Sequence, residues 1–366
     1  MFKRIYFFFL SYLVAMLLGQ TLFMLWFFHN GISIVEILFY YCVSYIFVFF
    51  LYSILEGRFF SSKFAFLFGI TASFLAVLVA NFIPIHTYYI YLIAFLFALN
   101  NVFFWTIYNV LYFRYSEKEE HGFKSGLYFL SFPILGAVLS PLSGLIAEKL
   151  GFPSLFLFSL ALYSIPFVFV FFLPNFNFVF KTREALKKIE HPLLVAFQGY
   201  IYMLTSNAIP IFTLFFITTP FKLGSFFGYL SIFAALAALF NSKISDKFKK
   251  RTSFFYIFAT LNALSYIPLV FSKSFVGWQL FSGINNFTYN LTNPFNLTLT
   301  LDHAKSEVLT TMLGRELYLN FGRIALIIFA LVIYYLTGSL QNALIYSALV
   351  PILYPILAYY KGVYIK

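Results

Sequence analysis

Three asparagines in the C-terminal part of the sequence have a spacing that could bind a polar solute. Asn286, Asn290 and Asn293 recur at i, i+4 and i+7, so on a helix they lie on one face, with Tyr289 beside them. The surrounding residues are apolar enough to lie in a membrane, where an amide turned to lipid would leave its donors and acceptors unpaired. We therefore expect this face to contact protein or a watery cavity.

A second stretch carries a similar face, formed by Asn101, Trp105 and Tyr108. If the two faces lie opposite each other, the amides can exchange hydrogen bonds with a solute and the rings can stack on it. This combination favours a small neutral polar or polar–aromatic solute, for example a sugar-like molecule. The alternative interpretation is that the asparagines bridge neighbouring helices, where each such hydrogen bond contributes about 1 kcal/mol.

Charged side chains inside apolar stretches are further candidates, because an ionised group within a membrane is a functional hypothesis by default. Glu316, Asn320 and Arg323 occur at i, i+4 and i+7 and share a helix face. Arg323 either lies at an interface between two parts of the protein or forms a packing salt bridge with Glu316. Glu36 follows Ser33 by three residues, which is typical of a capping box. No acidic residue is predicted at mid-bilayer, which argues against proton symport of the usual carboxylate type.

The composition excludes a soluble domain and several kinds of site. Of the 366 residues, 62% are hydrophobic and only 10% are charged, whereas soluble domains have about 25% charged residues. The net charge of +12 is spread over short loops, which indicates membrane topology and not a nucleic-acid surface. The single cysteine, Cys42, excludes an intrachain disulfide and a cysteine metal cluster. The sequence has no phosphate-binding loop, nucleophile elbow or zinc motif, so we expect no enzyme, metal or cofactor.

Twelve apolar stretches are long enough to cross a bilayer, which takes about 20 residues. They are predicted as helices at about 5–28, 32–55, 64–82, 88–113, 125–147, 154–172, 192–218, 223–241, 253–271, 275–301, 312–336 and 343–360. With both termini in the cytoplasm, 20 of the 24 lysines and arginines fall on the cytoplasmic side, as the positive-inside rule requires. The sequence therefore predicts an all-α, multi-pass protein, which we place in the plasma membrane.

A basic stretch from Lys181 to His191 lies at the middle of this pattern, with six predicted helices on each side. The predicted parts are an N-terminal half at 1–175, a cytoplasmic linker at 176–191 and a C-terminal half at 192–366. An offset of 185 residues relates Gly57 to Ser242, and also the pair Asn100–Asn101 to Asn285–Asn286. One offset for two landmarks indicates two pseudo-symmetric six-helix halves.

The loop after 223–241 resembles the signature loop of the major facilitator superfamily, which reads roughly Gly-x-Leu-Ala-Asp-Arg-x-Gly-Arg-Arg. The matching residues are Ile244, Asp246, Lys247, Phe248, Lys250 and Arg251. The first-half copy keeps Gly57 and Arg58, with Ser61 in the place of the acid. The junction of the fifth and sixth predicted helices, which includes Pro141 and Gly144, also resembles the family. The resemblance in layout covers the whole chain.

This resemblance implies a secondary transporter in which two halves rock around a site lined by the first, fourth, seventh and tenth helices. Gln20, Gln198 and Asn207 lie in the first and seventh of these helices, so we expect them to bind substrate as well. The resemblance also implies that Asp246 locks onto the start of the fifth helix, where a carboxylate can accept from free N–H groups. The other residues expected in these gating loops are Gly57, Arg58, Lys247 and Arg251.

Two other functions stay open at this point. Efflux of hydrophobic compounds is favoured by Trp105 and by the 24% aromatic content. A non-transporting membrane scaffold or receptor is favoured by the degenerate signature loops. As partners we expect a small-molecule substrate and the lipid bilayer, with no nucleic acid, and we expect the chain to be a monomer.

Overall fold

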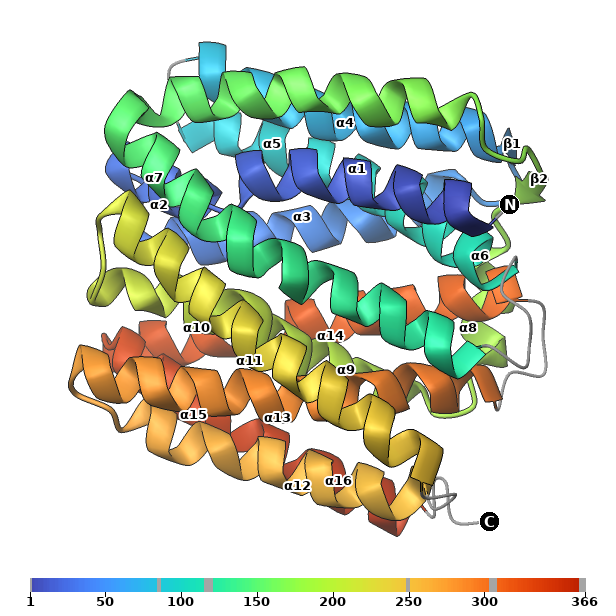
Figure 1. Ribbon diagram of the computed structural model, residues 1–366. Helices are drawn as coiled ribbons and strands as arrows, with labels where there is room; N and C mark the ends of the chain where they lie inside the picture. The colour runs from blue at the N-terminus through green and yellow to red at the C-terminus, as the bar shows by residue number, and fades with distance from the viewer. Residues whose placement is uncertain (1, 84–86, 115–120, 248–250, 303–307, 362–366) are drawn as a thin grey trace.

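The computed structural model describes residues 2–83, 87–114, 121–247, 251–302 and 308–361. Long helices lie side by side in one bundle (Figure 1). Aliphatic and aromatic side chains fill its interior, and large apolar residues such as Phe50 and Tyr335 also stand on its outside, as expected for helices surrounded by lipid. The predicted all-α fold is confirmed.

In the first half of the chain, two of the predicted crossings are interrupted. The helices of this half are α1 (Phe2–Gln20), α2 (Phe23–His29), α3 (Ile34–Ile54), α4 (Ser62–Phe82), α5 (Thr87–Asn100), the π-helix η1 (Asn101–Trp105), α6 (Thr106–Arg114) and α7 (His121–Val170). The first crossing consists of α1 and α2, and the fourth consists of α5, η1 and α6. The capping box at Ser33 and Glu36 is present at the start of α3. Within α7 the chain reverses at Gly151, whose φ of 83° suits glycine, so α7 contains the fifth and sixth predicted helices (Figure 1).

The second half of the chain contains the remaining long helices. They are α9 (Pro192–Met203), the π-helix η3 (Leu204–Ala208), α10 (Ile209–Phe212), the 3-10 turn η4 (Thr213–Phe215), α11 (Pro220–Lys247), α12 (Arg251–Val270), α13 (Phe275–Asp302), α14 (Val308–Thr337), α15 (Leu340–Leu349), the 3-10 turn η5 (Val350–Ile352) and α16 (Leu353–Tyr360). The helices α9 to η4 follow one another as the seventh predicted crossing, and α15 to α16 as the twelfth.

Nine stretches within the described residues are long and apolar enough to cross a membrane. One of them, Leu130–Val170, has 41 residues and includes the reversal at Gly151, so it supplies two crossings. The two other predicted crossings are the interrupted helix from Pro192 to Phe215 and α13, which is a continuous 28-residue helix rich in Asn and Thr. The described helices are therefore consistent with twelve crossings.

The two halves of the chain are in close contact where α7 packs on α11. Gly144 of α7 lies against the backbone of Pro220 and Phe221, and Gly224 of α11 lies against the carbonyl of Ser140. A side chain at either glycine would meet backbone atoms, so only glycine permits this approach. At the same end, the Glu148 carboxylate accepts a hydrogen bond from the Phe221 N–H at 3.0 Å, at the start of α11.

The segment around the predicted basic linker contains secondary structure that the sequence analysis did not predict. Strand β1 (Phe59–Ser61) pairs antiparallel with β2 (Asn177–Val179), and α8 (Thr182–Lys188) follows. Helix α8 has Glu184 in its first turn and Lys187 and Lys188 in its last, an order that suits the helix dipole. The predicted linker 176–191 therefore contains a short strand and a short helix, which its charge alone does not reveal.

Helix α8 is held from both halves of the chain. The Glu56 carboxylate, just after α3, accepts from the Thr182 N–H at 2.6 Å and from the Arg183 N–H at 3.3 Å. The Tyr318 hydroxyl of α14 donates to the Leu186 carbonyl at 3.2 Å. These bonds join the end of α3, the linker helix and the first turns of α14.

We predict that Glu56→Ala releases the start of α8. Hydrogen bonds to a charged group contribute roughly 1.5–3 kcal/mol, and the variant loses two of them. The expected result is faster tryptic cleavage after Arg183 and Lys187 and a lower thermal unfolding midpoint of the purified protein. Arg58→Ala, which changes an exposed neighbour in the same loop, serves as the control. Equal cleavage rates in the two variants would contradict a role for Glu56.

Candidate functional site

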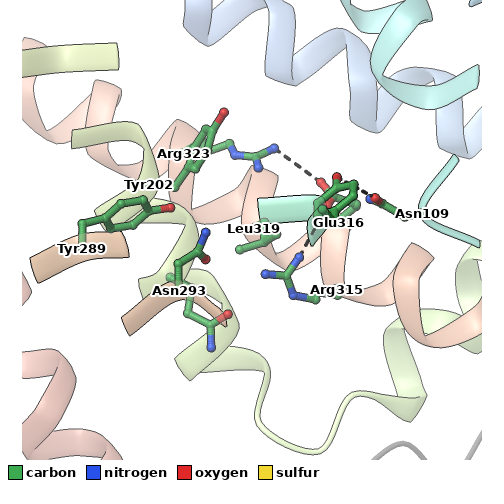
Figure 2. Close-up of a pocket in the computed structure, with 10 residues that line it drawn as sticks. Asn109, Tyr202, Tyr289, Asn293, Arg315, Glu316, Leu319 and Arg323 are labelled. Atoms are coloured by element: carbon green, nitrogen blue, oxygen red, sulfur yellow. Dashed lines mark hydrogen bonds and ion pairs between the residues drawn. The ribbon is translucent and has the colours of Figure 1, made fainter. Parts of the chain in front are cut away.

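A cavity of about 130 Å³ accessible to water lies between helices from both halves of the chain. A single water needs about 10–15 Å³ on this measure, so the cavity has room for a small solute. Its lining residues come from α6, α7, α9, α13 and α14 (Figure 2). They are Asn109, Tyr128, Gln198, Tyr202, Tyr289, Asn293, Arg315, Glu316, Leu319 and Arg323.

Three of the lining side chains are charged, and Glu316 lies between the two arginines (Figure 2). Its carboxylate is 3.5 Å from the Arg323 Nη1 atom and 3.7 Å from the Arg315 Nη1 atom. The exposed fractions of the side chains are 13% for Glu316, 11% for Arg315 and 8% for Arg323. Charges this far from solvent are costly unless they are paired.

Arg323 has four partners around its guanidinium group. Besides Glu316, the Asn320 amide oxygen accepts from Nη1 at 2.7 Å. The group also lies over the rings of Tyr202 and Tyr45, at 4.5 Å and 5.2 Å from the ring centroids. Tyr45 belongs to α3, so Arg323 both pairs with Glu316 on its own helix and faces a helix of the other half.

The uncharged lining residues provide hydrogen-bonding groups and rings. The Tyr128 hydroxyl donates to the Asn109 amide oxygen at 2.9 Å. The Gln198 amide donates to the Tyr354 hydroxyl at 3.2 Å, while its own oxygen is buried without a partner. A second, smaller cavity shares Gln198, Tyr289 and Asn293 with the first. These amides lie at the junction of the two spaces, where they can hydrogen-bond a solute.

The asparagine face of α13 is divided between the cavity and a helix contact. Tyr289 and Asn293 line the cavity. Asn286 instead donates to the Leu230 carbonyl of α11 at 2.6 Å, and Asn290 donates to the Asn286 carbonyl at 2.8 Å. The interhelical interpretation therefore describes Asn286, and the solute-binding interpretation can apply to Asn293.

The other predicted face, Asn101, Trp105 and Tyr108, does not line the cavity. Tyr108 stacks on Phe9 with ring centroids 4.4 Å apart, and Trp105 packs against Phe9 and other rings of the first half. Asn101 begins the π-helix η1, whose wider turn changes the phase of every later residue. Asn109, one residue beyond Tyr108, lines the cavity from α6.

The two remaining predicted binding residues also lie away from the cavity lining. The Gln20 amide donates to Ser73 at 2.7 Å and to Tyr163 at 3.1 Å, inside a buried polar network of the first half. Asn207 lies in the π-helix η3, and its amide nitrogen is buried without a partner. Their part in binding stays a prediction.

The signature-loop residues can be placed only in part. Gly57 has a φ of 72°, and the exposed Arg58 follows it before β1. Asp246 and Lys247 end α11 and Arg251 begins α12, but their side chains lie outside the described residues. The predicted lock between Asp246 and the start of α7 stays a prediction.

Comparison with known sequences identifies the family. The sequence model of the Major Facilitator Superfamily matches residues 5–315, which is most of the chain. The chain belongs to the major facilitator superfamily. A search of curated protein sequences finds no match. Membership in this superfamily agrees with the resemblance noted in the signature loop and makes the chain a multi-pass membrane transporter and not an enzyme.

Solved structures with the same fold include members of this superfamily. A POT family transporter in complex with a thioalcohol-conjugated peptide has a TM-score of 0.72 at 13% identity, over 99% of this chain and 96% of that one. The E. coli fucose:proton symporter FucP has a TM-score of 0.64 at 12% identity, over 98% of each chain. The human organic anion transporter MFSD10 has a TM-score of 0.68 at 10% identity, over 97% of this chain and 99% of that one. At these identities the likeness shows the fold.

Several lining residues of this superfamily member were not among the predicted site residues. They are Asn109, Tyr128, Tyr202, Arg315 and Leu319. Arg315 was counted with the charges of the cytoplasmic loops, because it lies near the predicted start of its helix. Its spacing to Arg323 is i, i+8, with Leu319 halfway, and this is the periodicity of one helix face. That spacing is the signal that could have revealed Arg315.

We predict that Glu316→Gln strongly destabilises the transporter. Removing one member of a buried ion pair costs about 3–5 kcal/mol, because the remaining charges are left uncompensated, and here two guanidinium groups lose their partner. The expected result is a clear fall in the thermal unfolding midpoint of the purified protein. Glu184→Gln, which removes an exposed carboxylate from α8, should leave the midpoint unchanged. An unchanged midpoint in Glu316→Gln would show that Glu316 does not carry the charge assigned to it.

Proposed function

We propose that this chain is a secondary transporter that moves a small polar or polar–aromatic solute by alternating access. The observation that carries the proposal is the cavity itself. It is lined by α6 and α7 from one half of the chain and by α9, α13 and α14 from the other. A solute bound between two bodies can be exposed to either side of the membrane when one body rocks against the other.

The moving bodies in this proposal are the predicted halves, residues 1–175 and 192–366, connected by the linker 176–191. The close contact of α7 with α11 at Gly144 and Gly224 provides a surface along which they can pivot. The gating loops, with Asp246 as the locking carboxylate, belong to the same proposal. We further propose a plasma-membrane location with both termini in the cytoplasm, and a monomeric transporter.

The chemistry of the lining supports a polar solute. Amides of Gln198 and Asn293 offer donors and acceptors, and the rings of Tyr128, Tyr202 and Tyr289 offer stacking surfaces. Efflux of purely hydrophobic compounds fits less well, because such compounds would cover these polar groups without replacing their hydrogen bonds. The sequence-based expectation of a neutral, sugar-like solute rests on the amides and did not include Arg315.

Proteins of similar fold give a reference for the size of solute. The solved structures include a POT family transporter in complex with 5-aminolevulinic acid and a fucose:proton symporter. Both compounds are small and polar. Uptake of a small polar solute into liposomes that contain only this purified protein tests the proposal. Liposomes that take up none of a panel of sugars, amino acids and organic acids would instead favour the scaffold or receptor alternative.

We predict that Asn293→Leu impairs transport while Asn290→Leu does not. Asn293 lines both cavities, so its loss removes a hydrogen bond to the solute, and we expect KM to rise by roughly 5- to 150-fold for a loss of 1–3 kcal/mol. Asn290 bonds to Asn286 within its own helix and serves as the matched control. Uptake kinetics in liposomes measure the effect. Equal KM values in the two variants would remove Asn293 from the site.

We predict the membrane topology from single introduced cysteines. Lys187→Cys in the linker should react with an impermeant maleimide only in inside-out vesicles, and Lys149→Cys should react in intact cells. The native Cys42 has an exposed fraction of 3% and should give little background. Labelling of position 187 in intact cells would contradict the cytoplasmic placement of the linker.

A further inference from the structure

We infer that the solute carries a single negative charge, and that Arg315 binds this charge as a carboxylate. The inference rests on the proposed transport function and names the class of its substrate as a small organic monocarboxylate. It arises from the balance of charges around the cavity, which the amides and rings alone do not reveal.

The lining carries one more positive charge than negative. Arg315 and Arg323 are the cations that line the cavity, and Glu316 is the anion that lines it, among the side chains that the structure describes. One carboxylate therefore serves two guanidinium groups. An uncompensated charge away from water raises the free energy of the protein. An anion that enters the cavity neutralises the remaining positive charge, and this favours its binding.

The excess charge belongs to Arg315 and not to Arg323. Arg323 pairs with Glu316, donates to the Asn320 oxygen at 2.7 Å and lies over the faces of Tyr202 and Tyr45. For Arg315 the described contact is one nitrogen of its fork 3.7 Å from Glu316, which is an ion pair without a hydrogen bond. The Nε atoms of both arginines are buried without a hydrogen-bond partner. The two residues differ in their other nitrogens, because a hydrogen bond is described for Arg323 and none for Arg315.

A guanidinium group with unused donors matches a carboxylate, because its planar fork can donate two parallel hydrogen bonds to the two oxygens. A monoanion balances the excess of one charge. A phosphate monoester carries close to two negative charges and would leave the cavity negative. A zwitterion would need a second free carboxylate for its ammonium group, and Glu316 is already shared by both arginines.

The rest of the lining fits the body of such a molecule. The rings of Tyr128, Tyr202 and Tyr289 can contact a flat or aliphatic body, and the amides of Gln198 and Asn293 can bind a hydroxyl or carbonyl group. The carboxylate of the solute is therefore held by a charged contact, and the rest of the molecule is held by these rings and amides. This arrangement distinguishes a carboxylate from a neutral molecule of the same shape.

The test compares charged and neutral probes of matched shape on the purified full-length protein. The thermal unfolding midpoint is measured with benzoate against benzamide, with lactate against lactamide, and with phenyl phosphate. We expect at least one carboxylate to raise the midpoint in a dose-dependent way, with an apparent Kd at least tenfold lower than that of its amide. Phenyl phosphate should stabilise less than benzoate.

Variants of Arg315 show whether this residue holds the anion. Arg315→Met should keep or raise the midpoint of the protein without probe, because an uncompensated charge is removed, and should abolish stabilisation by the carboxylate. Arg315→Lys keeps the charge but lacks the fork and should weaken binding of the carboxylate at least tenfold. Lys149→Met removes a positive charge from an exposed position outside the cavity and should leave the carboxylate effect intact.

Three outcomes of the probe-binding measurements would overturn the inference. They are stabilisation by the amides equal to that by the carboxylates, no stabilisation by any carboxylate, and unchanged carboxylate binding in Arg315→Met. Failure of Arg315→Met to fold would also overturn it, since Arg315 would then be a structural partner of Glu316. Uptake of a neutral solute that depends on Asn293 would leave the proposed transport function in place while rejecting the anion. Absence of any uptake would reject the transport function itself.

Discussion

The sharing of one buried carboxylate by two arginines is the interaction on which the site depends. Moving an ion out of water costs several kcal/mol even after the protein relaxes, and three ions lie together here. Glu316 and the arginines all belong to α14, so they place three charges on the face of that helix that lines the cavity. The helices that pack around α14 supply partners for these charges, such as the rings of Tyr45 and Tyr202 that lie against Arg323. The amide-lined space beside them exists because this face of α14 cannot be covered with apolar side chains.

The described helices are consistent with the crossings predicted from the sequence, because hydrophobic length is a property of whole segments. The sequence could not predict that the segment around Asn177 pairs with Phe59–Ser61, since strand pairing between distant residues leaves no local periodicity. The offset of 185 relates Asn100 to Asn285 but not their hydrogen-bond partners. Asn100 donates to the Gly69 carbonyl of the preceding long helix, and Asn285, 185 residues later, donates to Ser265 of its own preceding helix.

The site was predicted less completely than the fold because helix phase was assumed to be uniform. The spacing of Asn101, Trp105 and Tyr108 is that of an α-helix, whereas η1 is a π-helix and shifts the residues that follow it. On α13, one face of the helix is broad enough to contact both a cavity and a neighbouring helix. Asn293 and Asn286 show these two environments only seven residues apart. Sequence spacing predicts which residues share a helix face. The positions of the neighbouring helices decide which of those residues line a cavity and which contact another helix.

The placement of the charges connects the cavity to the linker. Gly314 of α14 packs against the Ala185 carbonyl of α8, and Arg315 is the next residue. Tyr318, two residues after Glu316, donates to Leu186 of the same linker helix. One turn of α14 thus touches α8 on one side and lines the cavity on the other. The opposite side of this turn rests on the linker helix, whose first residues are bonded to Glu56 at the end of α3. Because α14 packs on α8 and α8 is bonded to Glu56, any displacement of α14 would have to move α8 or lengthen the hydrogen bonds of Glu56. The linker helix therefore connects α3 and α14 next to the cavity.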